Sequence, residues 1–260
     1  MKTLHLHINQ ITLIPPEIGE LQKLEILGLS GNRIQSLPPE IGNLKSLKTI
    51  HLENNQLSSL PREFGNLANL ENALELSHNI LTRLPPEIGA LRKVEHLLVN
   101  NNRLEALPPQ IGQMENLKSL SIYENRLKFL PPEIGNLQKL GFIEAHHNHL
   151  ETLPAQMATL ASLKTLLVQN NRLKTIPREI AQVKSLYKMI LNDNQIESLP
   201  PEIGNLPNLE ILSIENNPIS SLPIQMKNLT RLKELYLRGT NIREIPPEIR
   251  ALPNLEVLNS

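Results

Sequence analysis

One pattern of hydrophobic and polar positions repeats every 23 residues along this chain. Residues 24–46 read LEILGLSGNRIQSLPPEIGNLKS, and residues 47–69 read LKTIHLENNQLSSLPREFGNLAN. A fixed period of this length predicts a repeat architecture in which each copy forms one structural unit. The first copy begins at Met1, a stub begins at Leu255, and further copies begin at Leu70, Val94, Leu117, Leu140, Leu163, Leu186, Leu209 and Leu232.

Each copy carries more large aliphatic side chains than a unit of this size encloses by itself. In the second copy, Leu27-Gly28-Leu29 alternates with period two, which predicts a short strand with one buried face. Stacking each copy on the next buries the apolar side chains in one continuous column. We therefore expect parallel strands about 4.8 Å apart, and one domain over residues 1–260 because no linker interrupts the repeat.

An asparagine at one fixed phase supports this stacking. It follows the strand leucines, where the chain must turn inward. A side-chain amide has two donors and an acceptor, so it can satisfy backbone groups that a buried turn would leave unpaired. The last copy carries Thr240 at this phase, which makes fewer such bonds. The predicted ladder consists of Asn9, Asn32, Asn55, Asn79, Asn102, Asn125, Asn148, Asn171, Asn194 and Asn217.

The second half of each copy begins with a proline, which forbids a central strand there. The order Pro39-Glu40 suits the first turn of a short helix, with the carboxylate at its positive end. Seven copies then carry a glycine, such as Gly42, but Ala158 and Ala181 replace it elsewhere. A positive φ is therefore not required, and we expect a tight helical turn packed against its neighbour.

The consensus LxxLxLxxNxLxxLPxEIGxLxx resembles the signature of leucine-rich-repeat proteins. It is similar to the 23-residue class of bacterial, notably spirochaete-type, proteins and of intracellular scaffolds related to scribble. The match covers essentially the whole chain in about eleven copies. The resemblance implies an α/β solenoid shaped as a curved horseshoe, with a parallel β-sheet on the concave face and short helical, 3-10 or extended turns on the convex face. It also implies protein binding through the concave face.

Composition removes several classes of function. Lys plus Arg and Asp plus Glu each number 26, so no net charge favours nucleic acid or an anionic membrane. No apolar run is long enough to span a bilayer. The absence of cysteine excludes disulfides, thiolate catalysis and Cys-ligated zinc. No signal peptide is visible before the first repeat, which fits a cytoplasmic protein and equally a mature or trimmed one; a secreted or cell-surface location is favoured.

The ends of the chain lack the polar terminal units that normally seal a repeat array. The sequence opens on Met1-Lys2-Thr3-Leu4 and stops at Leu258-Asn259-Ser260, within a copy. We expect flanking sequence to complete the array. The alternative is self-association, in which an uncapped end pairs with another chain.

Two copies depart from the consensus. The fourth has one extra residue at Asn72-Ala73, which predicts a bulge at the entry to that strand without a break in the stack. The seventh has Ala145 in place of a core leucine. Because cores do not tolerate large voids, a neighbour such as Phe129 is expected to fill the space.

Residues that alternate with the strand leucines are expected to point outward from the concave sheet. Leu167 and Ile190 should be direct cross-strand neighbours, with Phe142 and Ile211 diagonal to them. Either this is an apolar binding patch or it reflects only the preference of strands for β-branched and aromatic residues. The predicted partner-binding set is His96, Leu98, Tyr123, Phe142, Glu144, His146, Leu167, Gln169, Ile190 and Ile211.

A histidine cluster is the second candidate site. His146 and His147 share one segment, and Glu124 is expected beside His147. Imidazole and carboxylate are ligands for zinc, so these three residues are a candidate metal site, although adventitious zinc and ordinary exposed histidines explain the same pattern. A second, weaker group is formed by His5, His7 and His51.

An enzyme would need a nucleophile with a base, a general acid–base pair in a cleft, or a metal with an open position. The outward carboxylates and histidines are expected on an open sheet, which does not exclude water, so no catalysis is predicted and no cofactor is required. The leading hypothesis is a non-catalytic module that binds a partner protein through its concave face, as an exported bacterial protein with a host- or surface-interaction role and hence a candidate virulence factor. An intracellular scaffold or adaptor in signalling is the alternative, and a self-assembling array is a third.

Overall fold

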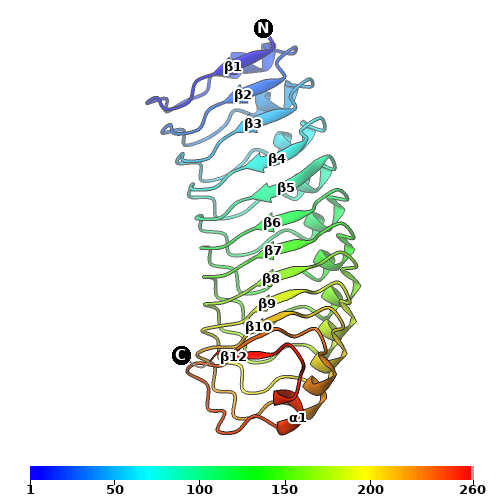
Figure 1. The fold of residues 1–260 in the computed structure, drawn as a ribbon. Helices are drawn as coiled ribbons and strands as arrows, with labels where there is room; N and C mark the ends of the chain where they lie inside the picture. The colour runs from blue at the N-terminus through cyan, green and yellow to red at the C-terminus, as the bar shows by residue number, and fades with distance from the viewer. Residues whose placement is uncertain (259–260) are drawn as a thin grey trace. The chain divides into compact units, whose positions relative to one another are not determined.

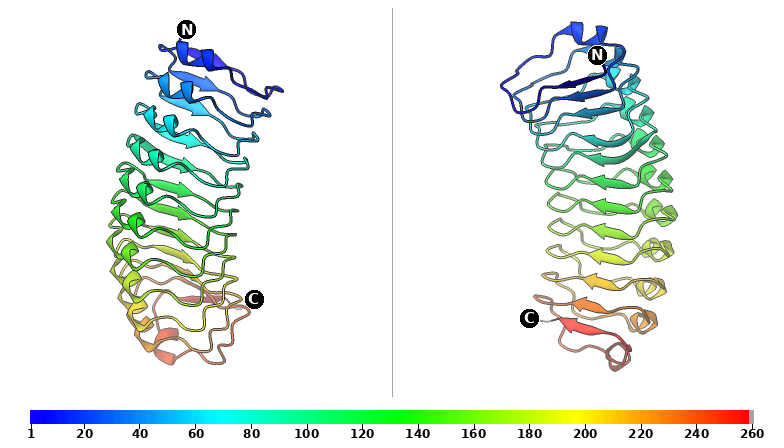
Figure 2. Two further views of the ribbon diagram at one scale, coloured as in Figure 1. Left: turned by 180° about the vertical axis from the view of Figure 1, so that it is seen from behind. Right: turned by 45° about the horizontal axis from the view of Figure 1, so that its top comes forward.

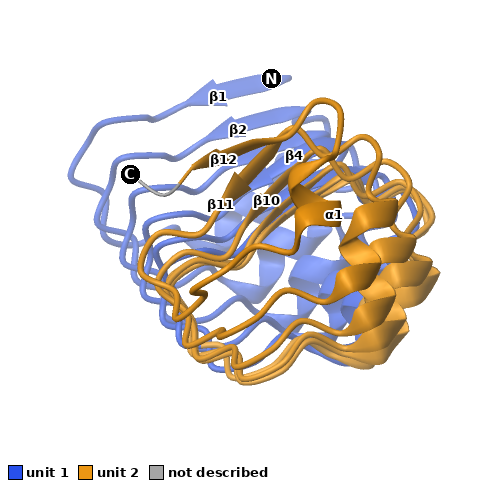
Figure 3. Ribbon diagram, turned by 60° about the horizontal axis from the view of Figure 1, so that its bottom comes forward, with its two compact units in different colours: residues 1–126 blue, residues 127–260 orange. Residues whose placement is uncertain are grey.

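The computed structural model describes residues 1–258 of the chain. The packing of the chain divides it into two compact units, residues 1–126 and 127–260, which Figure 3 shows in different colours. A single domain over residues 1–260 stays a prediction. The expected open end at Asn259 and Ser260 lies outside the described residues.

In residues 1–126, each coil contributes one short strand that pairs in parallel with the strand of the next coil (Figure 1). Successive side chains of a strand point to opposite faces of the sheet. The side chain of Leu27 points to the inner face and is fully buried. The strands are β1 (Thr3–His5), β2 (Ile26–Gly28), β3 (Thr49–His51), β4 (Asn72–Glu75), β5 (Val94–Leu98) and β6 (Ser119–Ser121). The 3-10 helices are η1 (Pro16–Glu20), η2 (Pro39–Asn43), η3 (Arg62–Asn66), η4 (Pro86–Ala90) and η5 (Pro109–Gln113).

Residues 127–258 follow the same plan, which confirms the predicted leucine-rich solenoid coils. Leu166 and Met189 are the inward residues of neighbouring strands and are fully buried. The strands are β7 (Phe142–Glu144), β8 (Thr165–Leu167), β9 (Lys188–Ile190), β10 (Ile211–Ser213), β11 (Glu234–Tyr236) and β12 (Glu256–Leu258). The helices are η6 (Pro132–Asn136), η7 (Ala155–Thr159), η8 (Arg178–Gln182), η9 (Pro201–Asn205), η10 (Ile224–Asn228) and α1 (Pro247–Arg250).

Apart from α1, the predicted helical turns are short 3-10 helices, and they lie on the other side of each coil from its strand (Figure 2). In η2, Pro38 is the N-cap in an extended conformation and Pro39 opens the helix. The N–H of Leu44 closes the turn by donating to the carbonyl of Ile41 at 3.2 Å. Proline fits this start because its missing N–H would have no partner in the first turn.

The glycines of these turns permit close packing between consecutive coils. Gly42 and Gly204 are outside the left-handed region, as predicted. A Cβ added to Gly42 would collide with the carbonyl oxygen of Glu63 in the next turn, and one added to Gly204 would collide with that of Gln225. The glycine therefore serves close approach of two backbones rather than an unusual φ.

The asparagines of the predicted ladder join consecutive coils through their side chains. Asn171 Oδ1 accepts the N–H of Leu150 at 2.9 Å, and its Nδ2 donates to the carbonyls of Ala145 at 3.0 Å and Val168 at 3.0 Å. Both the side chain and these backbone groups are buried. Similar bonds, each joining two coils of one unit, are made by Asn32, Asn55, Asn79, Asn102, Asn125, Asn194 and Asn217.

The two ends of the ladder differ from its middle. Asn9 is exposed, and its Nδ2 donates to the carbonyls of Leu6 and His7 within its own coil. Thr240 donates its hydroxyl to the carbonyl of Leu237 at 2.8 Å. The amide in the middle of the ladder satisfies groups of two coils, whereas the residues at these ends satisfy groups of their own coil.

A left-handed residue precedes the ladder asparagine in coil after coil, a feature the sequence analysis missed. Gly31 and Gly239 take φ values of 66° and 70°, and Asn54 takes 57°. Glycine and asparagine tolerate this region. Ile8 takes the same conformation with φ 54° although it is β-branched, which is unfavourable for such a side chain.

The two departures from the consensus have different outcomes. The bulge is confirmed, since the β4–β5 register shifts between Asn72 and Ala73 while pairing continues through Glu75. The filling of space beside Ala145 by Phe129 is wrong. Ala145 is fully buried, but the Phe129 side chain is 53% exposed, because Phe129 follows the ladder asparagine on the outgoing part of the coil and does not turn inward.

Candidate functional site

The outward side of the sheet in residues 127–258 carries the predicted apolar patch. Leu167 of β8 lies directly opposite Ile190 of β9. Phe142 pairs with Thr165, which places it diagonal to Leu167, and Ile211 is diagonal to Ile190 in the same way. All four patch residues are half-buried. The alternation of the strands therefore brings Phe142, Leu167, Ile190 and Ile211 together as one patch.

Polar side chains occupy the margin of this patch. Glu144 lies opposite Leu167 in the β7–β8 register, and its Oε1 is 3.3 Å from Nε2 of His146. On the other side, Asn192 Nδ2 donates to Glu215 Oε2 at 2.9 Å. Gln169, which follows Leu167 by two residues, has a buried Oε1 that accepts no hydrogen bond from any described residue. An apolar centre with a polar margin is a common composition of protein interfaces.

Tyr236 extends the outward face beyond Ser213, its partner in the β10–β11 register. Its hydroxyl donates to Glu234 Oε2 at 2.8 Å. This hydrogen bond, followed by partial burial and the charges of Glu234, Glu256 and Glu215, raises the pKa of Tyr236. The phenol therefore stays neutral and serves as a donor within an acidic part of the face.

Three residues of the predicted binding set lie in residues 1–126. His96 and Leu98 are half-buried outward residues of β5, and Leu98 is paired with Glu75 on one side and Ser121 on the other. Tyr123 is half-buried just beyond β6. They belong to the unit of residues 1–126, whereas the apolar patch lies in the other unit.

The predicted zinc site stays a prediction, and the structure shows other contacts of its residues. Glu124 accepts a hydrogen bond from Nδ2 of Asn101, and Nε2 of His146 faces Glu144. The ring of His147 packs edge-on against that of His146, with centroids 5.1 Å apart. Among residues 1–258, no three His, Asp or Glu side chains gather closely enough to hold a metal ion.

The weaker histidine group is a stack of rings rather than a ligand set. The ring of His7 lies 5.4 Å from that of His5 and 5.7 Å from that of His51. It covers Gly28, where any Cβ would collide with the imidazole. His7 Nδ1 also contacts the hydroxyl of Ser30. The glycine in the outward row is thus the reason that a histidine from the neighbouring coil can lie there.

Some residues of this face were absent from the predicted set. The alternation predicts that Asn192 and Tyr236 point outward, although neither is in the predicted binding set. Glu215 shares the phase of Asn192, so the same alternation could have identified it. The hydrogen bond between Asn192 and Glu215 could not be read from the sequence, because both residues occupy an ordinary polar phase. Only the cross-strand register shows that they meet.

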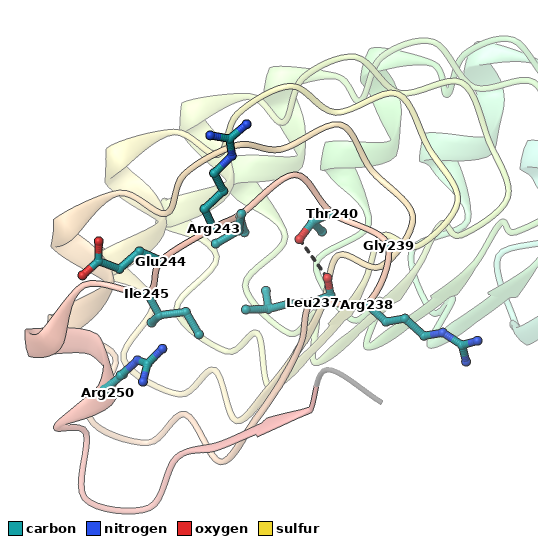
Figure 4. A pocket seen from close by; sticks show the side chains of 9 residues that line it. Leu237, Arg238, Gly239, Thr240, Arg243, Glu244, Ile245 and Arg250 are labelled. Atoms are coloured by element: carbon teal, nitrogen blue, oxygen red, sulfur yellow. Dashed lines mark hydrogen bonds between the residues drawn. The ribbon is translucent and has the colours of Figure 1, made fainter.

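A cavity of about 220 Å³ lies at the last complete coil (Figure 4). Its apolar lining includes Leu237 and Ile245, which are buried at core phases of the repeat. Arg238 points away from the cavity, and Arg250 lies near Ile245. Its lining also includes Arg243, Glu244 and Arg250, which are exposed, so the cavity has a charged as well as an apolar side.

Within residues 1–258, no helix is long and apolar enough to cross a membrane.

Comparisons with known proteins agree with this geometry. Family models described as "Leucine-rich repeat region" and "Leucine rich repeat" match residues 1–73 and residues 92–150, 161–219 and 184–242. None of the curated proteins matches the sequence significantly.

Several solved structures resemble the chain. A leucine-rich-repeat protein of Leptospira interrogans is 39% identical with a TM-score of 0.89, over 99% of this chain and 66% of that one. The ectodomain of the Arabidopsis thaliana receptor kinase GASSHO1/SCHENGEN3, solved with CASPARIAN STRIP INTEGRITY FACTOR 2, is 30% identical with a TM-score of 0.76, over 95% and 33%. The Drosophila Toll–Spatzle complex gives 26% identity and a TM-score of 0.88, over 98% and 37%. The chain thus spans less than two thirds of each of these proteins.

Proposed function

Because this chain belongs to the leucine-rich-repeat family, we propose that it binds a partner protein through the apolar patch on the outward face of residues 127–258. The observation that carries the proposal is the direct pairing of Leu167 with Ile190 on the side of the sheet opposite the core. Phe142 and Ile211 widen the same surface. Solved relatives described as complexes, of a plant receptor ectodomain and of Toll, support protein binding by such coils.

The patch suits an interface because its side chains are large, apolar and held on adjacent strands. A partner that covers Leu167 and Ile190 removes their apolar surface from water. The β8–β9 pairing already fixes the backbone of both residues, so binding does not have to order this part of the protein. The remaining predicted residues, including Glu144, His146 and Gln169, would form the polar margin. His96, Leu98 and Tyr123 would contribute only to a partner that also contacts residues 1–126.

The family and its fold are typical of interaction modules rather than of enzymes, and the chain is proposed to be non-catalytic. We further propose an exported bacterial protein with a host- or surface-interaction role, which the likeness to the Leptospira protein supports. The alternative is an intracellular scaffold or adaptor. Fractionation of the source cells with a specific antibody separates them: export requires protein in the medium or open to external protease, and a purely cytosolic pool contradicts it.

A photo-crosslinker tests the binding surface directly. Benzoylphenylalanine placed at Leu167 is expected to capture a discrete partner from extracts of the source cells or of its host. The same group at Thr175, which is exposed in the same coil but away from the sheet, is the matched control. The partner is then purified and its affinity measured.

Leu167→Asp with Ile190→Asp is expected to weaken that affinity at least tenfold, because charges would replace apolar contacts at the centre of the interface. The control is Thr175→Asp with Ser198→Asp, which adds the same charge to the same two coils. Circular dichroism checks that both variants fold. An unchanged affinity in the Leu167→Asp/Ile190→Asp variant contradicts the proposal.

A further inference from the structure

The outward face of residues 127–258 has a charge layout that restricts what the apolar patch accepts. Glu144 is the neighbour of Leu167, and Ser213 is the neighbour of Ile190 on the other side. Glu215 follows Ser213 by two residues, and its Oε2 is held by Asn192 Nδ2 at 2.9 Å and by Ser213 Oγ at 3.5 Å. Leu167 and Ile190 therefore lie between two carboxylates.

The spacing of these carboxylates is within reach of two long side chains on an extended peptide. Glu144 and Glu215 come from strands three steps apart, roughly 14 Å at about 4.8 Å per step, and Glu215 lies two residues, or about 7 Å, further along its strand. The two positions are therefore roughly 16 Å apart. An extended segment advances about 3.3 Å per residue and points alternate side chains the same way, so positions i and i+4 are about 13 Å apart. When such a segment crosses the strands, i and i+4 reach the two carboxylates and i+2 lies over Leu167 and Ile190.

We infer that this face recognises an extended segment of a partner protein that carries Lys or Arg at positions i and i+4 and a large apolar residue at i+2. The inference rests on the proposed function and names the chemistry of the partner. Lys or Arg is expected at positions i and i+4 of the segment because the carboxylates of Glu144 and Glu215 flank Leu167 and Ile190.

Lys188 and Arg238 are cations near this line, and His146 faces Glu144 at 3.3 Å. Lys188 is in the other outward row, between Thr165 and Ile211, so it lies beside the line from Glu144 to Glu215 and not on it. It disfavours a further cation on that side of the segment. Arg238 shares the phase of Glu215 in the following coil and is exposed, so it flanks the Glu215 end of the line.

Three synthetic peptides test the inference: GRSFSRG, GESFSEG and the neutral GSSFSSG. Each is titrated into the full chain labelled at its isoleucine δ1-methyl groups, and proton–carbon NMR spectra are recorded. GRSFSRG is expected to shift the methyl signals of Ile190 and Ile211 and to bind at least tenfold tighter than GESFSEG. Ile224, which is 39% exposed in η10 and away from the sheet, is expected not to move. Conservative Ile→Val variants assign the signals.

A second experiment removes the carboxylate charges from the protein. The double variant Glu144→Gln/Glu215→Gln is expected to bind GRSFSRG about tenfold more weakly than the parent and to bind GSSFSSG with unchanged affinity. Glu151→Gln with Glu197→Gln removes the same charge from exposed positions outside the outward rows and is expected to change neither. Added salt should weaken GRSFSRG more than GSSFSSG, because screening acts on the exposed ion pairs.

The outcomes separate this inference from the proposed function. If GESFSEG or GSSFSSG moves Ile190 and Ile211 with the same affinity as GRSFSRG, the basic preference is overturned while the apolar patch remains a binding surface. If no peptide moves either methyl group, an extended segment of this kind is not the ligand and the inference fails. Crosslinking at Leu167 then decides the proposed function independently.

Discussion

Asn171 in one coil and Leu150 in the preceding coil are joined by a hydrogen bond from the Leu150 N–H to the Asn171 Oδ1 at 2.9 Å. The same side chain donates from Nδ2 to the carbonyl of Ala145, also in the preceding coil, at 3.0 Å. One buried amide therefore satisfies groups on two backbones. Stacking in these coils depends on hydrogen bonds as well as on apolar burial, which couples each coil to its neighbour.

Asn171→Ala is therefore expected to lower the free energy of unfolding by about 1–3 kcal/mol, because it leaves a buried N–H and buried carbonyls without partners. Asn9→Ala is the control. Asn9 has the same phase but is exposed, so water replaces its bonds and the cost is expected below about 0.5 kcal/mol. Urea unfolding measures both. Equal losses in the two variants would show that the ladder contributes little beyond a local turn.

Gly204→Ala tests the close packing of the 3-10 turns. Its Cβ would collide with the carbonyl oxygen of Gln225 in the next coil, so the coils must move apart and the variant is expected to lose about 1–3 kcal/mol. Ala181 occupies the same phase and is buried, so the reverse change Ala181→Gly removes only one methyl group and its cost is expected to be smaller. Thermal unfolding compares the two. A Gly204→Ala variant as stable as the parent would contradict the steric role of this glycine.

Most of the fold could be predicted from the sequence because each copy carries the same apolar strand pattern and the same proline. The period-two pattern around Leu27 and the proline at Pro38 define the strand and the turn, and the structure has both where they were predicted. The outward direction of Leu167 and Ile190 follows from the same alternation.

Other features depend on where side chains end in space. The sequence placed Phe129 beside Ala145 by proximity along the repeat, but the direction of the chain at Phe129 exposes it. The zinc prediction counted suitable residues at His146 and His147, but the sequence could not show that His146 faces Glu144 or that the two imidazole rings pack edge-on. The left-handed turn before the ladder was missed because no single residue type marks it: besides glycine and asparagine, residues such as Ile8, Glu124 and Asp193 occupy that position.

Ile8→Asn is expected to stabilise the protein by about 1 kcal/mol. Ile8 holds φ 54° while its side chain is 87% exposed, so the native state bears the cost of a β-branched residue in the left-handed region and gains little from burial. Asparagine takes this conformation at Asn54. Ile8→Val keeps the β-branch and is the matched control. Chemical unfolding should separate the two, and an equal change in both would remove backbone strain as the cause.

Glu75 gives a prediction with a defined pH dependence. It is an outward residue of β4, paired with His51. Partial burial raises the pKa of its carboxyl above the ordinary 4.5 and the Glu53 carboxylate raises it further, while His51 acts in the opposite direction. The folded protein therefore binds this proton more tightly than the unfolded chain, so stability falls as the pH rises from the ordinary carboxyl pKa through the folded-state pKa.

Glu75→Gln removes the ionisation and is expected to raise the melting temperature at pH 7 more than at pH 4, where the parent carboxyl is largely protonated. Glu105→Gln makes the same charge change at an exposed position outside the outward rows and controls for net charge. The direction is opposite to that of a carboxylate stabilised by an ion pair, which would lose stability on neutralisation at pH 7. A Glu75→Gln variant that melts below the parent at pH 7 would therefore show that the carboxylate is stabilised in the fold and is not crowded by Glu53.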